Sequence, residues 1–170
     1  MSITSDAIVV ATVVAGAGSS AVVDLRSRRI PNFLTLPLAA VGLGLAASGS
    51  SGLSLGASIG GVIVGLLLML PGHLFGGTGG GDVKLLAALG SVLGPHKVLS
   101  AFLYSAIAGG LLAIGYAVAR GRLHTTLRGT ARLVTQPSAT KAEVDRPAAN
   151  NRFPYGPAIA LGCVLAALGY

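Results

Sequence analysis

Charged residues are scarce in this chain, and acidic residues are the scarcest. Only 10% of the residues are charged, against about 25% in soluble domains. No Asp, Glu, Lys or Arg occurs from residue 31 to residue 81. The whole chain has five acidic residues: Asp6, Asp24, Asp82, Glu143 and Asp145. Because 52% of the residues are hydrophobic and the mean hydropathy is +0.78, a soluble globular domain is excluded and most of the chain is expected to lie in lipid.

Cysteine and metal-ligand clusters are also missing. The single cysteine, Cys163, excludes an internal disulfide and a zinc–cysteine cluster, and its apolar surroundings indicate a small packing residue. The three histidines, His73, His96 and His124, are too scattered to form a metal site. The glycine run at 76–81 lacks the Gly-Lys-Ser/Thr of a phosphate-binding loop. We therefore expect no cofactor and no metal.

Apolar segments alternate with short polar ones along the chain, which predicts an all-α polytopic membrane protein with a single membrane-embedded domain at 1–170. The segments are long enough for about six spans, although the fourth is short. The predicted spans are about 7–23, 33–47, 53–70, 80–94, 98–119 and 154–170. The polar segment 120–152 is predicted to be a loop with a short surface helix and a flexible linker.

The net charge of +7 is better explained by membrane topology than by nucleic acid, because the basic residues lie in the loops. All 12 Lys and Arg residues except Lys97 fall on one side of the six predicted spans. This side is predicted to be cytoplasmic, which places both termini outside. No basic residue precedes the first span, which favours a retained helix over a cleaved signal. The short fourth segment requires either that the glycine run begins inside the bilayer or that the bilayer is thinned there.

Two aspartates are predicted to lie at the same depth on the cytoplasmic face. Asp24 ends the first span and Asp82 begins the fourth. Two carboxyls close together in a poorly solvated site share one proton, because both cannot ionise. The ionised carboxylate can activate a water while the protonated one donates to a carbonyl oxygen. The pair is therefore suited to peptide-bond hydrolysis.

Other interpretations of these residues remain open. Asp82 follows glycines and precedes an apolar helix, as an N-cap does, and Asp24 can pair with Arg28 four positions later. The two carboxyls can also form an ion relay in a small transporter or assembly scaffold. The segment Gly49-Ser50-Ser51-Gly52 fits the Gly-x-Ser-Gly of rhomboid proteases, but the last span holds no histidine to act as base.

Three motifs, in order along the chain, resemble those of the type IV prepilin peptidases. The first is Asp24 with its basic loop ending in Ile30-Pro31-Asn32. The second is the Gly-x-Gly-Asp of residues 79–82, followed by Lys84. The third is the Pro-Tyr-Gly-Pro of residues 154–157, which opens the last span. The resemblance covers nearly the whole chain.

The resemblance implies that Asp24 and Asp82 are the catalytic residues of a membrane aspartic protease. It also implies supporting roles, in catalysis or in packing, for Gly79, Gly81, Lys84, Arg26, Asn32, Pro154, Gly156 and Pro157. The implied substrates are prepilins or pseudopilins, each with a basic leader followed by an apolar helix. The implied partners are this substrate and the lipid bilayer, without nucleic acid. The implied location is the cytoplasmic membrane, with the active site at the cytoplasmic face.

The chain departs from the larger, bifunctional members of that family. Those members carry Cys-x-x-Cys motifs in an extended cytoplasmic region and also methylate the new N-terminus, whereas this sequence has one cysteine. It therefore resembles the short, peptidase-only form associated with Flp-type (tight-adherence) pili. A preflagellin-type leader peptidase is the alternative within the same class.

Overall fold

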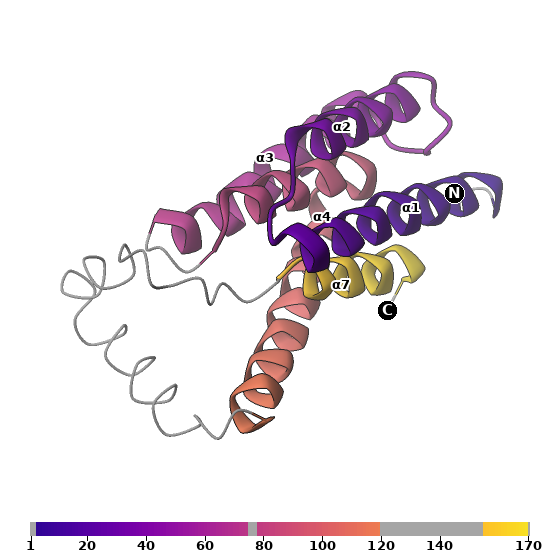
Figure 1. Ribbon diagram of the computed structural model, residues 1–170. Coiled ribbons are helices and arrows are strands. Elements are labelled where there is room, and N and C mark those ends of the chain that lie inside the picture. Colours follow the sequence, from indigo (N-terminus) through magenta and orange to yellow (C-terminus); the bar gives the residue numbers. More distant parts are fainter. Residues whose placement is uncertain (1–2, 75–77, 120–154, 170) are drawn as a thin grey trace.

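The described part of the protein is entirely helical. The computed structural model describes residues 3–74, 78–119 and 155–169, and it contains no strand in these ranges. The helices are α1 (Ile3–Ser27), α2 (Asn32–Ala47), α3 (Leu55–Leu74), α4 (Gly80–Ala119) and α7 (Gly156–Leu168). Helices α1 and α7 lie side by side, and α3 and α7 make their most extensive contacts with α4 (Figure 1). Helix α4 is therefore the central element of the bundle.

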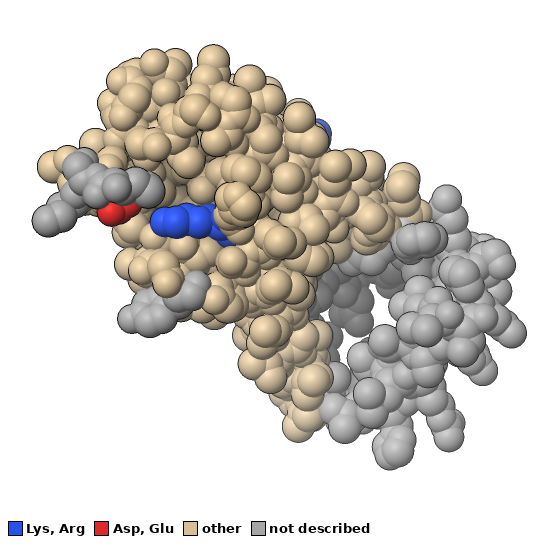
Figure 2. Space-filling model, turned by 180° about the vertical axis from the view of Figure 1, so that it is seen from behind, with Lys and Arg blue, Asp and Glu red and all other residues tan. Residues whose placement is uncertain are grey.

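The surface of the bundle is that of a membrane protein. Among the described residues, three helices are long and apolar enough to cross a bilayer, over Thr4–Ser27, Leu55–Leu74 and Gly80–Gly115, and α2 and α7 are shorter apolar helices. Few Lys, Arg, Asp or Glu side chains are visible on the face shown in Figure 2. Large apolar side chains are exposed instead, such as Leu36, which is 68% exposed. Lipid is the solvent that such a surface requires.

The ends of two helices differ from the sequence prediction. Helix α1 was expected over 7–23 but extends from Ile3 to Ser27. Helix α3 was expected to end near residue 70, and this was wrong, because the helix continues through Pro71 to Leu74. Pro71 lies in the last turn, where the missing N–H removes only one helical hydrogen bond. The Thr78 N–H then donates to the Gly72 carbonyl oxygen at 3.1 Å, so this carbonyl in the last turn has a hydrogen-bond partner.

The predicted fourth and fifth spans are joined by one residue rather than by a loop at 95–97. Gly94 alone is non-helical within α4, with φ 77° and ψ 172°. Glycine adopts this left-handed φ without steric cost, and Pro95 can begin the second half because a first-turn N–H needs no helical partner. The chain folds back there, since a Cβ added at Gly90 would lie 3.3 Å from the Val98 side chain. The non-helical residue therefore lies directly before the predicted break at 95–97, whose residues are helical.

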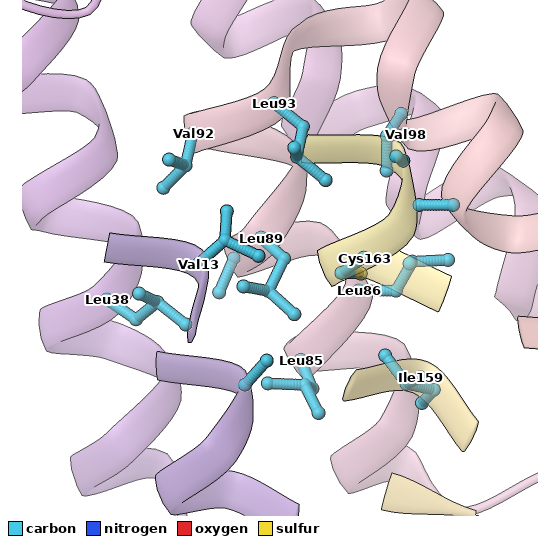
Figure 3. Packing of buried hydrophobic residues seen from close by; sticks show 14 of the residues in the cluster. Val13, Leu38, Leu85, Leu86, Leu89, Val92, Leu93, Val98, Ile159 and Cys163 are labelled. Carbon is cyan, nitrogen blue, oxygen red and sulfur yellow. The ribbon is translucent and has the colours of Figure 1, made fainter. Parts of the chain in front are cut away.

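The core lies where the first half of α4 meets the other helices (Figure 3). Its buried side chains come from all the described helices, and α3 contributes Met69. The labelled members are Val13, Leu38, Leu85, Leu86, Leu89, Val92, Leu93, Val98, Ile159 and Cys163. Cys163 is 0% exposed among these apolar neighbours, which confirms that it is a packing residue.

Glycines allow α3 and α4 to approach at backbone distance. A Cβ added at Gly61 would collide with the carbonyl group of Gly90 on α4. We therefore expect Gly61→Ala to lower the free energy of unfolding by about 1–3 kcal/mol, because overpacking forces the backbones apart. The matched control is Gly56→Ala on the same helix, where the added methyl meets only Ser54 Oγ at 4.0 Å. Thermal unfolding in detergent compares the two variants, and equal melting temperatures would contradict the close approach.

Candidate active site

Asp24 is buried at the C-terminal end of α1 and faces the N-terminus of α7. Its side chain is 5% exposed, and its Oδ2 accepts the Gly156 N–H at 2.9 Å. Gly156 is the first residue of α7, where N–H groups have no helical partner and the helix dipole is positive. The end of α7 therefore supplies both a hydrogen bond and a favourable field to the Asp24 carboxylate.

The contact between Asp24 and α7 requires glycine at position 156. A Cβ added there would lie 2.8 Å from both Cβ and Oδ2 of Asp24, which is closer than real Cβ contacts allow. Pro157 follows in the first turn of α7, where its fixed φ favours helix initiation. Pro154, which the sequence also singles out, lies outside the described residues.

Asp82 occupies the third position of α4 and binds the residue that precedes the helix. It is 9% exposed, and its Oδ2 accepts the Gly79 N–H at 3.1 Å. The backbone N–H of Asp82 donates in return to the Gly79 carbonyl oxygen at 3.1 Å. This is one half of a capping box, because the carboxylate three residues after the cap accepts the cap N–H, while the glycine cap has no side chain to accept the return bond. The N-cap interpretation of Asp82 is thus wrong in position, because Gly79 holds the cap.

The loop that follows Asp24 packs against the residues that flank Asp82. Ile30 is buried, and a Cβ added at Gly81 would lie 3.0 Å from Ile30 Cβ and 3.1 Å from its carbonyl oxygen. Beyond Gly81, the Lys84 ammonium donates to Asn32 Oδ1 at 3.0 Å. These two contacts bring the first and second sequence motifs together at one end of the bundle.

Tyr155 directly precedes Gly156 and connects the start of α7 to α4. Its hydroxyl donates to the Ser105 carbonyl oxygen in the second half of α4 at 3.1 Å. The hydrogen-bond partner of Asp24 is therefore held against the helix that carries Asp82.

Some residues singled out from the sequence lie apart from this cluster or do not contribute to it. Arg26 is exposed on the last turn of α1. In the turn between α2 and α3, Ser48 and Ser50 share a hydrogen bond of 2.9 Å, and the Leu53 N–H donates to Ser51 Oγ at 3.4 Å, so these hydroxyls complete the turn. Ile30 and Tyr155 were not predicted as site residues, although both stand inside the quoted motifs.

A separate cavity of about 260 Å³ lies near the opposite end of α1. Its walls include Val9, Leu53, the Gly94 break and Lys97, and no Asp or Glu lines it. Among the described residues, no group of three His, Cys, Asp or Glu side chains could hold a metal ion. The convergent polar groups of this part of the chain are those around Asp24 and Asp82.

Comparison with known proteins confirms the family that the motifs resemble. A family model described as the type IV leader peptidase family matches residues 10–114. The chain belongs to this family. The matched range holds Asp24 and Asp82 but ends before α7. No solved structure was found to match the chain.

Two relatives of this chain share the name prepilin leader peptidase/N-methyltransferase. The protein from Xanthomonas campestris pv. campestris is 38% identical over 112 residues, which cover 61% of this chain and 38% of that protein. The protein from Bacillus subtilis (strain 168) is 34% identical over 113 residues, which cover 61% of this chain and 36% of that protein. The matches thus span little more than a third of either relative.

Proposed function

We propose that this chain is a membrane aspartic endopeptidase that removes the basic leader from prepilins or pseudopilins. The observation that carries the proposal is that two buried carboxyls, Asp24 and Asp82, stand on segments that pack together at one end of the described helices. Membership of the type IV leader peptidase family supports it independently. The proposed reaction uses only the side chains of Asp24 and Asp82.

The proposed reaction divides the work between one ionised and one protonated carboxyl. The ionised carboxylate takes a proton from a water, whose oxygen attacks the scissile carbonyl carbon. The protonated carboxyl donates its proton to the carbonyl oxygen, which gives a tetrahedral intermediate with two hydroxyls. The C–N bond then breaks as the carboxyl that took the water proton gives it to the leaving nitrogen, and the other carboxylate recovers its proton from a hydroxyl of the intermediate. Gly156 and Gly79 each donate one N–H to a carboxylate, which holds both acids in fixed orientations before substrate arrives.

The proposal includes a location and a topology. The chain forms one domain that crosses the cytoplasmic membrane six times, with both termini outside and the carboxyl pair at the cytoplasmic face. The fold-back at Gly94 supports counting the halves of α4 as separate crossings. The clustering of Lys and Arg on one side of the apolar segments supports the orientation. The leader of a prepilin would then be cut where it leaves the cytoplasm.

The test is co-expression with epitope-tagged substrates, followed by a gel shift and mass spectrometry of the new N-terminus. A type IV prepilin, an Flp-type prepilin and a preflagellin are run in parallel. We expect loss of the leader from the prepilins, with the Flp-type substrate preferred; this finer assignment is supported by the motif resemblance. If only the preflagellin is cleaved, the substrates would be preflagellins and not prepilins. Failure to cleave any of the three would favour the ion-relay alternative.

A further inference from the structure

His73, at the end of α3, reaches the glycine-rich segment that carries Asp82. Its Nδ1 lies 3.1 Å from the Thr78 carbonyl oxygen. A carbonyl oxygen only accepts hydrogen bonds, so Nδ1 must carry the proton. The imidazole also lies against the start of α4, because a Cβ added at Gly80 would be 3.4 Å from His73 Cε1.

The two sides of a single peptide unit connect His73 with Asp82. The Thr78 carbonyl and the Gly79 N–H belong to one planar trans peptide, in which they point in opposite directions. On one side the carbonyl accepts from His73, and on the other the N–H donates to Asp82 Oδ2 at 3.1 Å. Fixing one side of the plane therefore fixes the direction of the N–H on the other.

Other backbone contacts hold the neighbouring peptides rather than the Thr78 carbonyl itself. The Thr78 N–H donates to the Gly72 carbonyl oxygen at 3.1 Å, and the Gly79 carbonyl oxygen accepts the N–H groups of Asp82 at 3.1 Å and Val83 at 3.4 Å. The residues after Thr78 are glycines, which have no Cβ to restrict their backbone angles. Among the described residues, the hydrogen bond from His73 is the one that holds the Thr78 carbonyl directly.

We propose that His73 is a positioning residue for Asp82 and acts through the Thr78–Gly79 peptide. Its hydrogen bond orients the Gly79 N–H toward the carboxylate and polarises the peptide, so that the N–H becomes a stronger donor. This inference deepens the proposed peptidase function and rests on it. It concerns the arrangement of Asp82 and not contact with substrate.

Three substitutions separate the hydrogen bond from the packing of the ring. His73→Asn keeps an N–H donor at the position of Nδ1, His73→Phe keeps a ring without a donor, and His73→Ala keeps neither. We expect the Asn variant to retain kcat, and the Phe and Ala variants to lose at least about tenfold in kcat with KM unchanged, because a displaced catalytic group loses rate rather than binding. His96→Ala, at the Gly94 break, is the matched control and should equal wild type.

A second measurement does not depend on activity. Hydrogen–deuterium exchange in detergent follows the peptide that contains Gly79, and we expect faster exchange in the Phe variant than in the Asn variant. Equal exchange and equal kcat in these two variants would overturn the proposal, and so would a raised KM with unchanged kcat. If the wild-type enzyme does not cleave the prepilin, that result counts against the proposed function. The exchange rates of the Phe and Asn variants would still decide the role of His73.

Discussion

Asp24→Asn and Asp82→Asn are each expected to reduce leader cleavage by about 10²- to 10⁴-fold, the usual contribution of a general acid or base. Asparagine keeps the size of the side chain and one accepting oxygen, so the hydrogen bonds from Gly156 and Gly79 can persist. It cannot ionise or supply an acidic proton. The fraction of epitope-tagged prepilin that loses its leader measures the effect in membranes with equal amounts of enzyme.

Asp6→Asn is the matched control, because Asp6 is exposed in the first turn of the helix that carries Asp24. It should cleave as wild type does. The double variant of Asp24 and Asp82 should be no slower than the slower single variant, since residues that act as one unit are not additive. Cleavage that persists in both single variants would exclude the aspartic mechanism. If the fold-loss of the double variant equals the product of the two single fold-losses, the two carboxyls do not act as a coupled pair.

Gly156→Ala is expected to have the next largest effect. The added methyl would stand 2.8 Å from Oδ2 of Asp24, so either the carboxylate or the start of α7 must shift. A displacement of about 1 Å can cost on the order of 10²-fold in rate, and we expect a loss of this size in kcat. The decrease should appear in single-turnover cleavage of a prepilin at saturating enzyme.

The control for Gly156→Ala is Gly44→Ala, another glycine-to-alanine change in an apolar helix. A Cβ at Gly44 meets nothing within 4 Å. Alanine is the better helix former by about 1 kcal/mol, so this variant should be as active as wild type and at least as stable. If the alanine at 156 left kcat unchanged, the close packing of α7 against Asp24 would not matter for the reaction.

The sequence singled out the two aspartates for a physical reason; both are buried, and their catalytic role stays a prediction. Placing an ionisable side chain at the edge of an apolar segment costs free energy. Asp24 and Asp82 therefore stand out at the ends of the predicted spans. The glycines beside them were also informative, because residue 81 packs against Ile30 and residue 156 against Asp24. Here the chemistry of the side chain and its position along the helix are both readable from the residue types.

Other features could not be predicted because their partners are backbone atoms. His73 was set aside for lack of ligand spacing, yet it binds a carbonyl oxygen, which every residue possesses. The run Gly94-Pro95-His96-Lys97 is typical of a loop, and only backbone geometry shows that Gly94 alone makes the turn. Pro71 was expected to end α3, but the helix continues for three more residues to Leu74.

The contact between Gly156 and Asp24 has a consequence for biosynthesis. The two residues are 132 positions apart, so the Asp24 carboxylate emerges from the ribosome long before its N–H partner is made. Until α7 has entered the membrane and packed beside α1, the carboxyl near the end of α1 lacks that hydrogen bond and the field of the helix. The proposed site would therefore be complete only once the last described helix has packed beside α1.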